Sequence, residues 1–416
     1  MSEPLAVREA PARYLVEPEG QRVRLGYKQT EVGVIPEDWE VEFVENLAHV
    51  TTGGRNTQDR VEEGEYPFFV RSQTVERINT YSFDGEAVLT AGDGVGTGKV
   101  FHYINGKFDA HQRVYRISDF SERLNGYFFY LYFSSNFYSR IMQMTAKSSV
   151  DSVRREMIAR MQIPLPPTKA EQEAIAEALS DADALIASLE RLIAKKRQLK
   201  QGAMQELLTG KKRLPGFGGE WGKKRLGVLG KFLKGSGVKK DEANSGDLRC
   251  IRYGEIYTHH DDYVKTYNSR ISSVVAATAT PLKQGDLLFA GSGETKAEIG
   301  KCVAFIDDIE AYAGGDIVIL RPIGINSIFM GYYCNTSPIV AQKASKGQGD
   351  AVVHITASAL GSIEVSIPIL EEQTAIATIL SDMDADLAAL EQQLAKARGI
   401  KQGMMQELLT GKIRLV

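Results

Sequence analysis

The sequence predicts an α+β protein with two globular domains and two long helices, the helices pairing as an antiparallel coiled coil within one chain. Three observations lead to this fold class: a helical segment occurs twice, a domain-sized stretch precedes each copy, and these two stretches share landmarks. An internal repeat determines the architecture of a chain. A period of 201 residues is far too long for a solenoid. It indicates a duplicated half-molecule with pseudo-two-fold symmetry.

The repeated segment, residues 168–211, recurs as residues 369–412. Between 171–211 and 372–412, 27 of 41 positions are identical. Apolar residues in both copies are alternately four and three residues apart, the spacing of a coiled-coil seam. The expected helix–helix interface is formed by Ile175, Leu179, Ile186, Leu189, Ile193, Ile376, Leu380, Met383, Leu387, Leu390 and Leu394.

Signals for the ends of the helices differ between the copies. Thr168 followed by Glu171 predicts a capping box at the first helix, and the second copy has no such cap. Gly210 and Gly411 are placed to cap the C-terminal ends. Gly202 and its counterpart in the second copy are expected to bend or interrupt the helices, because an interior glycine costs about 1 kcal/mol.

The order of charges favours antiparallel pairing. Acidic residues occupy the first half of each copy, and basic residues follow in the second half, as in Arg191 to Lys200. Antiparallel packing places the acidic half of one helix opposite the basic half of the other. Each exposed ion pair contributes only about 0.5 kcal/mol, so the charges express a preference. The alternative is that this order merely complements the helix dipoles.

Composition limits the class of protein. The chain has 416 residues, 43% hydrophobic and 25% charged, as in ordinary globular proteins. Its three cysteines form no Cys-x-x-Cys pair, so neither a disulfide framework nor a zinc site is indicated, and the expected compartment is a reducing cytoplasm. We expect no signal peptide and no membrane span. With a net charge of −3, any nucleic-acid binding must come from local basic patches.

The two domains share landmarks. The only two tryptophans each open a Trp-x7-Leu-x5-Gly pattern, at Trp39 and Trp221, and each domain closes with Ile-Pro before its long helix. The chain is therefore expected to divide into an N-terminal arm (1–29), a first domain (30–167), a central helix (168–212), a second domain (213–368) and a C-terminal helix (369–416).

Short strands are expected to dominate both interiors. In the first domain, strands are predicted at 88–90, 99–104 and 113–117, separated by turn residues. The second domain offers the same order at 287–291, 300–306 and 317–321. A helical stretch follows late in each domain, near 126–142 and near 328–341. The interiors of the two domains are less alike than the two helices. This is expected if the domains recognise different targets; the alternative is neutral drift after duplication.

No motif indicates catalysis. The glycine-rich stretch 92–99 departs from a phosphate-binding loop, because Val100 replaces the Ser or Thr that would bind magnesium and a strand follows instead of a helix. A flexible hairpin loop is the preferred interpretation. The six histidines show no metal-binding spacing. We therefore expect a non-catalytic chain with no metal and no cofactor of its own.

Polar clusters beside predicted strands are better candidates for reading DNA. Arg, Gln, Asn and Glu match base edges in the major groove, whereas Lys mostly contacts phosphate. Each residue alone could equally be a solvated surface group. The candidate DNA-binding residues are Arg71, Ser72, Gln73, Thr74, Lys99, His111, Gln112, Arg113, Lys147, Arg154, Lys234, Ser236, Lys239, Arg252, Tyr253, Glu255, Lys296 and His354.

Several of these features together resemble one family. They are the stretch from Tyr27 to Trp39, the Pro164-Leu-Pro-Pro stretch followed by Glu171-Gln172, the Gln-Glu-Leu-Leu-Thr-Gly-Lys helix ends and the two-domain layout. Over nearly the whole chain they resemble the specificity (S) subunit of type I restriction-modification systems. The second half departs slightly, because it lacks the second proline pair.

The resemblance implies a function. Each domain would be a target-recognition domain that reads one half of a bipartite site in double-stranded DNA, and the helices would fix the spacing. The helices would also dock two modification (M) subunits, which use adenosylmethionine, and restriction (R) subunits would add ATP- and magnesium-dependent cleavage. Such a system works in the prokaryotic cytoplasm, in DNA modification and phage defence. Two other classes stay open: a coiled-coil adaptor that holds two protein-interaction domains, and an enzyme with an unrecognised site.

Overall fold

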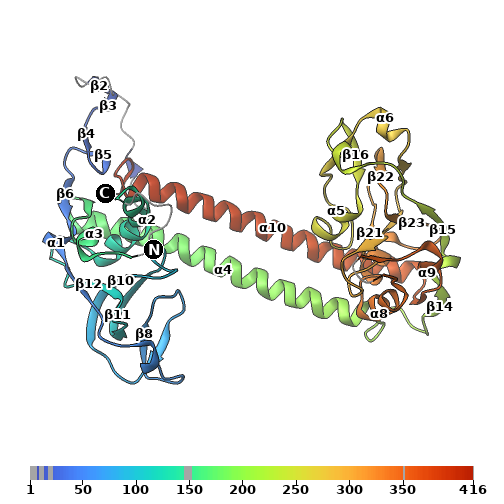
Figure 1. The fold of residues 1–416 in the computed structure, drawn as a ribbon, viewed down its shortest axis with the longest axis horizontal. Helices are drawn as coiled ribbons and strands as arrows, with labels where there is room; N and C mark the ends of the chain where they lie inside the picture. The colour runs from blue at the N-terminus through green and yellow to red at the C-terminus, as the bar shows by residue number, and fades with distance from the viewer. Residues whose placement is uncertain (1–6, 9–13, 17–21, 145–151, 350–351, 416) are drawn as a thin grey trace. The chain divides into compact units, whose positions relative to one another are not determined.

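The computed structural model describes residues 7–8, 14–16, 22–144, 152–349 and 352–415 (Figure 1). The chain forms two compact units. Unit 1 comprises residues 1–190 and 393–416, and unit 2 comprises residues 191–392. Each unit therefore contains one globular domain together with a part of both long helices. None of the described helices is long and apolar enough to cross a membrane.

A six-stranded sheet forms the centre of unit 1. Its strands are antiparallel except for the parallel pair β8 and β11. Helix α2 (Gly126–Met144) packs on the sheet and buries Phe128, Phe129, Phe133 and Phe137 against it. The strands in spatial order are β7 (His49–Thr52), β12 (Val114–Ser118), β10 (Phe83–Ala91), β11 (Phe101–Ala110), β8 (Tyr66–Phe69) and β9 (Glu76–Ile78).

Smaller elements complete unit 1. Strands from the expected N-terminal arm pair with each other and with the end of the chain. These elements are β1 (Val7–Arg8), β2 (Tyr14–Val16), β3 (Arg22–Arg24), β4 (Tyr27–Thr30), β5 (Gly33–Pro36), β6 (Glu40–Phe43), α1 (Val44–Leu47), the 3₁₀ helix η1 (Thr57–Asp59), α3 (Arg155–Ala159), β13 (Gln162–Leu165) and β26 (Arg414–Leu415).

Two four-stranded sheets form unit 2. The first contains, in spatial order, β15 (Gly230–Lys234), β23 (Ile317–Pro322), β19 (Leu287–Ala290) and β21 (Cys302–Ala304). The second contains β17 (Ser269–Ile271), β16 (Leu248–Ile251), β22 (Ala311–Ala313) and β18 (Thr280–Pro281). The other elements are β14 (Gly222–Arg225), η2 (Leu226–Val228), η3 (Lys240–Glu242), α5 (Tyr253–Thr258), α6 (Ser273–Ala276), β20 (Ser292–Gly293), α7 (Ser327–Tyr333), α8 (Ser337–Lys346), β24 (Val353–His354), α9 (Ala357–Gly361) and β25 (Glu364–Ile367).

One predicted helical stretch of unit 2 is helical but divided. The helical stretch expected over 328–341 is two helices, α7 and α8. Asn335 lies between them, and its side chain bonds the backbone N–H and C=O of Cys302. Pro338 lies in the first turn of α8, where a residue without a backbone N–H is tolerated. The same proline could not continue α7, because a helix interior needs that N–H.

The strand order is nevertheless the same in both units. Parallel pairing of β8 with β11 in unit 1, at Phe69 and Ala110, recurs in unit 2 as parallel pairing of β16 with β22, at Ile251 and Ala313. The difference is that β10 and β11 run continuously, whereas their counterparts are divided into β18 and β19 and into β21 and β22. The predicted α+β class with two domains is confirmed.

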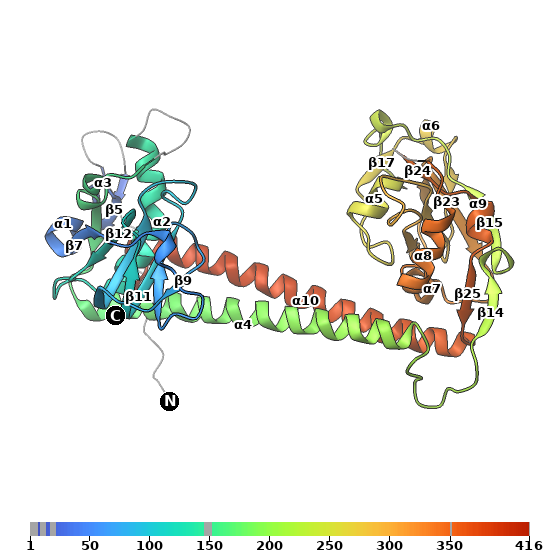
Figure 2. The ribbon, with the colours of Figure 1, turned by 60° about the horizontal axis from the view of Figure 1, so that its bottom comes forward.

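The two long helices are α4 (Lys169–Leu207) and α10 (Leu370–Leu408). They lie side by side in Figures 1 and 2. Both are helical through their interior glycines, so the interruption predicted as one outcome at Gly202 and Gly403 does not occur. Gly210 and Gly411 adopt φ values of +67° and +68°, which confirms them as C-terminal caps.

Ion pairs within each unit establish the antiparallel direction of the helices. In unit 2, Lys196 contacts Asp386 at 2.8 Å and Lys200 contacts Asp384 at 2.6 Å. In unit 1, Lys401 contacts Asp183 at 2.6 Å. The basic half of each helix thus faces the acidic half of the other, as the charge order predicts.

The predicted seam residues lie on the inner faces of the helices. Those that are half-buried are Ile186, Met383, Leu390 and Leu394. Those that are buried are Ile175, Leu179, Leu189, Ile193, Ile376, Leu380 and Leu387. Ile175 and Leu179 belong to the core of unit 1, while Ile376 and Leu380 belong to the core of unit 2. The helix ends are therefore built into the domains.

The predicted capping box forms only in part. Thr168 accepts the backbone N–H of Glu171, but the Glu171 carboxylate does not return to the cap. It is 4% exposed and accepts hydrogen bonds from Arg414, which follows the other helix. The same arrangement occurs at α10, where buried Glu372 pairs with Arg213 at 2.6 Å. Each long helix is thus tied at its start to the segment that follows the end of its partner.

Breaking one of these buried pairs should destabilise its unit. We predict that Arg414→Met lowers the free energy of unfolding of unit 1 by about 3 kcal/mol, because it leaves the Glu171 carboxylate buried and unpaired. Urea denaturation followed by Trp39 fluorescence, with Trp221→Phe in the background, reports on unit 1 alone. As a control, Glu190→Gln removes an exposed pair with Arg398 and should cost about 0.5 kcal/mol or less. Equal costs would contradict the prediction.

A buried histidine makes the stability of unit 2 depend on pH. His260 is 2% exposed, and neither ring nitrogen has a hydrogen-bond partner in the described part of the chain. Burial, reinforced by the charges of His259 and Lys301, lowers its pKa from 6.5 to about 4. Between these two values the unfolded chain binds a proton that the folded chain does not. Stability is therefore full above pH 6.5 and falls as the pH is lowered toward 4.

We predict that His260→Leu removes this pH dependence. Wild type should lose about 2 kcal/mol more than the variant when the pH is lowered from 7.5 to 5. The measurement is urea denaturation at both pH values, followed by Trp221 fluorescence, with Trp39→Phe present in both proteins. If the two proteins lose stability in parallel, His260 is not the group responsible.

Candidate nucleic-acid interface

Four loops of unit 1 meet beside the ends of β7, β8, β10 and β11. Backbone hydrogen bonds hold these loops together where regular strand pairing stops, so the side chains they carry project from a fixed backbone. The bonds run from Gly53 N to Val114 O (3.1 Å), His111 N to Phe69 O (2.9 Å), Gly92 N to Arg113 O (2.8 Å) and Gln112 N to Arg55 O (2.8 Å).

Unit 2 repeats the same four bonds at equivalent positions. Within each loop, the residues of unit 2 that make these bonds are displaced from those of unit 1 by one constant number of residues. The two loop clusters therefore share one backbone scaffold. The bonds run from Gly235 N to Ile317 O (2.8 Å), Gly314 N to Ile251 O (2.9 Å), Gly291 N to Asp316 O (2.7 Å) and Gly315 N to Gly237 O (3.1 Å). We call these two arrangements the loop scaffolds of unit 1 and unit 2.

Close backbone approach explains the glycines of the scaffolds. A Cβ on Gly53 would lie 2.0 Å from the carbonyl oxygen of Ala110, and one on Gly235 would lie 2.1 Å from that of Gly314. No side chain fits there. The Gly of the Trp-x7-Leu-x5-Gly pattern is therefore needed for the scaffold.

In unit 1 the scaffold brings two arginines onto one carboxylate. Arg71 Nη1 and Arg113 Nη1 donate to the two oxygens of Asp93, at 2.7 and 2.6 Å. Burial alone would raise the pKa of Asp93, but the two arginine hydrogen bonds hold it below its usual range. Both arginines are partly exposed, with 39% and 59% of their side chains accessible. Each keeps further N–H groups for a ligand while its direction is fixed.

The neighbouring residues complete this cluster. Gln112 is exposed and donates through Nε2 to Asn56 Oδ1 at 2.7 Å. His111 is buried, and its Nδ1 accepts the backbone N–H of Arg113 at 3.0 Å. Burial, followed by the charge of Arg71, lowers the pKa of His111, so the ring is neutral at pH 7. His111 thus supports the backbone of the cluster, whereas Gln112 and Arg113 face solvent.

In unit 2 different side chains occupy the equivalent positions. Tyr253, Ser292 and Asp316 stand where unit 1 has Arg71, Asp93 and Arg113, as the shared backbone bonds and strand registers define. Ser292 Oγ hydrogen-bonds His354 Nδ1 at 2.9 Å. The positively charged pair of unit 1 therefore has a neutral and acidic counterpart in unit 2.

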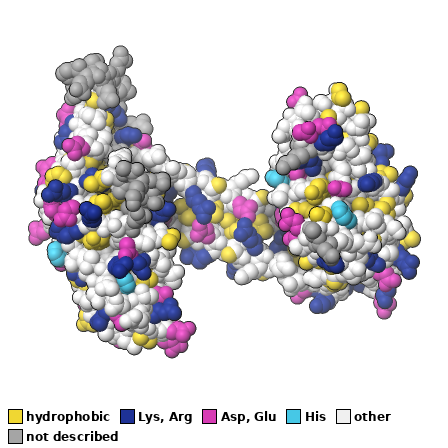
Figure 3. All heavy atoms as spheres, viewed as in Figure 1, with side chains coloured by type: hydrophobic (Ala, Val, Ile, Leu, Met, Phe, Trp, Pro, Cys, Tyr) yellow, Lys and Arg dark blue, Asp and Glu magenta, His cyan; other side chains and the backbone are white. Residues whose placement is uncertain are grey.

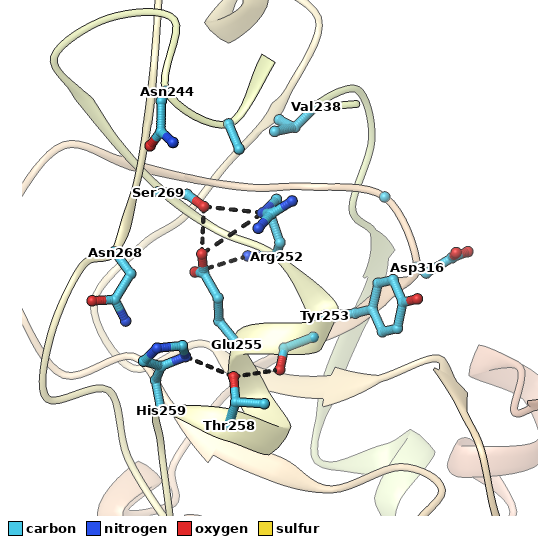
Figure 4. Close-up of a pocket in the computed structure, with 13 residues that line it drawn as sticks. Val238, Asn244, Arg252, Tyr253, Glu255, Thr258, His259, Asn268, Ser269 and Asp316 are labelled. Carbon is cyan, nitrogen blue, oxygen red and sulfur yellow. Dashed lines mark hydrogen bonds and ion pairs between the residues drawn. The ribbon is translucent and has the colours of Figure 1, made fainter. Parts of the chain in front are cut away.

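A hollow of about 610 Å³ opens beside the loop scaffold of unit 2 (Figure 4). Arg252 lines it with one third of its side chain exposed. Glu255 was predicted as a DNA-contacting residue, but its side chain is only 6% exposed. Its carboxylate accepts the hydroxyl of Ser269 and the backbone N–H of Arg252. The Glu255 carboxylate is therefore bonded within the protein and is not exposed on the surface, as a direct contact with DNA would require.

The other predicted residues are distributed around these loops. Lys147 lies outside the described residues. Ser236 donates to the carbonyl oxygen of Thr278 at 2.8 Å, and the ammonium of Lys99 lies 5.4 Å from the ring centre of Tyr138. The exposed members are Ser72, Gln73, Thr74, Lys99, Arg154, Lys234, Ser236, Lys239, Lys296 and His354.

Sequence reasoning missed the residues that orient the arginines. Asp93 belongs to the glycine-rich stretch 92–99, in which the sequence indicates only Lys99 as a candidate DNA contact. Ser269 and Asn268, which line the hollow of unit 2, are far from Arg252 in the chain, and no local signal marked them. No cluster of three or more metal-ligating side chains occurs among the described residues. On the face shown in Figure 3, Lys and Arg are interspersed with Asp and Glu.

Comparison with known proteins gives a family match over two segments. The family model described as "Type I restriction modification DNA specificity domain" matches residues 36–200 and 218–397. One relative, the type I restriction enzyme EcoDI specificity subunit of Escherichia coli, is 32% identical over 169 residues, which are 41% of this chain and 36% of that protein. The MjaVIII specificity subunit of Methanocaldococcus jannaschii is 23% identical over 92% of this chain and 94% of its own length.

Solved structures share the fold. The crystal structure of the type I restriction-modification system S subunit from M. genitalium matches with a TM-score of 0.61 at 17% identity. The match covers 89% of this chain and 96% of that one. At this identity the likeness establishes the architecture of two domains and two long helices, and nothing about individual contacts.

The loop scaffolds predict which glycines cannot be replaced. Gly53→Ala should lower the free energy of unfolding of unit 1 by about 2 kcal/mol or more, because the new Cβ meets a backbone carbonyl. At neighbouring Gly54 a Cβ would have no atom within 4 Å, so Gly54→Ala should change stability by about 0.5 kcal/mol or less. Urea denaturation followed by Trp39 fluorescence with Trp221→Phe compares the two. Similar losses for both variants would exclude the close approach as the cause.

Proposed function

Because the chain belongs to the type I restriction modification DNA specificity family, we propose that it is the subunit that selects the DNA sequence in such a complex. The domain of unit 1 reads one half of a bipartite site in double-stranded DNA, and the domain of unit 2 reads the other half. The observation that carries this proposal is the shared loop scaffold with different side chains on it. One backbone presents Arg71 and Arg113 in unit 1, and Tyr253 and Asp316 in unit 2.

The chemistry of these side chains suits base reading. Arginine matches the two acceptors of guanine in the major groove, and Gln, Asn, Asp and Glu also have partners among base edges. Residues fixed by internal hydrogen bonds lose little conformational freedom on binding, which favours discrimination between sequences. The exposed lysines around the loops contact phosphates and position the domain on the duplex.

The two long helices connect the two domains that read the half-sites. Their pairing makes binding of the second half-site an intramolecular event once the first is bound, and its effective concentration is high only when the half-sites have the right separation. We assign the helices the further role of docking two modification (M) subunits, to which restriction (R) subunits are added. Adenosylmethionine, ATP and magnesium belong to these partners, and this chain is a non-catalytic component of the prokaryotic cytoplasm.

Exchanging one domain tests the proposal. Replacing residues 215–366 by the equivalent segment of another specificity subunit should change one half of the methylated motif and leave the other half intact. The measurement is motif-resolved methylation sequencing of DNA from cells that carry this chain with its M subunit. Wild type should give a bipartite motif with an unread spacer.

Two controls sharpen this experiment. Reintroducing the original segment should restore the original motif, and a second exchange limited to residues 30–167 should change only the opposite half. A motif that changes in both halves, or in neither, would refute the division of labour between the domains.

A further inference from the structure

The hollow in unit 2 contains an arginine that is held on one side only. Arg252 follows β16 and lines the hollow together with Asn244, Asn268 and Asp316 (Figure 4). Its Nε donates to Ser269 Oγ at 3.0 Å. Within the described part of the chain, neither terminal nitrogen, Nη1 or Nη2, has a hydrogen-bond partner. The end of the guanidinium is thus free while its stem is fixed.

Two buried residues hold the stem. Ser269 is 2% exposed and donates its hydroxyl to Glu255 Oε1, which also lies 3.7 Å from Arg252 Nε. Glu255 Oε2 accepts the backbone N–H of Arg252 at 3.3 Å, so the carboxylate fixes both the main chain and the side chain of the same residue. Burying a carboxylate and a hydroxyl costs free energy unless their hydrogen bonds are made. A solvated surface arginine has no need of such support, so the arrangement points to a ligand.

We propose that Arg252 reads a guanine in the half-site of unit 2, with Ser269 and Glu255 as its positioning residues. With Nε occupied, Nη1–H and Nη2–H remain as a parallel pair of donors, which matches O6 and N7 of guanine in the major groove. This inference rests on the proposed function and specifies a contact within it.

The surroundings favour a base edge over a phosphate, the other group that an arginine fork binds. The carboxylates of Glu255 and Asp316 line the same hollow and would repel a phosphate. The amides of Asn244 and Asn268 and the carboxylate of exposed Asp316 are groups that bond base edges.

The backbone here is also unusual. Val238 and Asp316, which both line the hollow, have φ values of +58° and +57°. A β-branched residue at positive φ is strained, and such strain is retained where the surrounding structure fixes a loop for a purpose.

The contact should be absent from the other half-site. The position equivalent to Arg252 in unit 1 is Val70, since β8 and β16 share their pairing with β11 and β22. Unit 1 instead presents Arg71 and Arg113 from its loops. The guanine read by Arg252 therefore belongs to one half of the motif, which makes the assignment testable position by position.

The first test is motif-resolved methylation sequencing with the full chain and its M subunit. Arg252→Ala and Arg252→Lys should both relax the requirement for one guanine, in the half of the motif that changes when residues 215–366 are exchanged. Lysine should not rescue the requirement, because it keeps the charge but lacks the paired donors of the guanidinium. Ser269→Ala should relax the same position less strongly. Arg270→Ala is the matched control: this exposed arginine lies outside the lining of the hollow and should leave the motif unchanged.

The second test addresses the atoms. Binding of the chain–M complex is measured on duplexes in which that guanine is replaced by 7-deazaguanine, which lacks the N7 acceptor. Wild type should lose affinity several-fold on the modified duplex, while Arg252→Ala should bind both duplexes equally. On the unmodified duplex, Arg252→Ala should bind about 5- to 150-fold more weakly than wild type.

Other outcomes would overturn the inference. If Arg252→Ala weakens all sequences equally and lowers the slope of log affinity against log salt by about one, the arginine contacts phosphate. If Arg252→Lys retains the guanine, no fork is needed. If Arg252→Ala misfolds, Ser269→Ala with an unchanged motif is sufficient to reject the assignment. A wild-type motif without two halves would instead refute the proposed function itself.

Discussion

The fold depends on two ion pairs with buried carboxylates, each of which joins the start of one long helix to the segment after the end of the other. Glu171 at the start of α4 pairs with Arg414 beyond the end of α10, and Glu372 at the start of α10 pairs with Arg213 beyond the end of α4. The arginines also lie over the rings of Trp39 and Trp221, at 5.7 and 5.9 Å. Such pairs fix register because neither charge can be left buried alone. Each domain is thus completed by a segment that comes from the far end of a helix.

The loop scaffolds separate stability from specificity. Their hydrogen bonds are made by the backbone, so they persist when side chains change, and their glycines are required by close approach rather than by function. Side chains on the scaffold can therefore diverge with little cost to the fold, and the arginines they include are oriented by carboxylates: Asp93 in unit 1, and Glu255 through Ser269 in unit 2. An arginine that is already oriented has less rotamer entropy to lose, about 2 kcal/mol at most, when it binds.

Much of the architecture could be predicted from the sequence, because it rests on local periodicity. The repeated segment, the four-and-three spacing from Ile175 to Ile193, the charge order and the capping glycines Gly210 and Gly411 each act within a few helical turns. The short strands predicted between turn residues also form, as in β10 and β12 of unit 1 and β19 and β23 of unit 2, although their order in the sheets was not predicted. The capping box at Thr168 was only half right, because a distant partner, Arg414, took the Glu171 carboxylate.

Only the tertiary structure decided which polar residues work together. The sequence placed Arg71 and Arg113 among the candidates, but not Asp93 that joins them, and it indicated Glu255 as a surface reader although folding buries it. Likewise Ser269 meets Arg252 across 17 residues of chain. Periodicity encodes which face of an element is buried, and this is a local property. The partner of a polar side chain depends on loop closure between strands far apart in sequence, which no local pattern records.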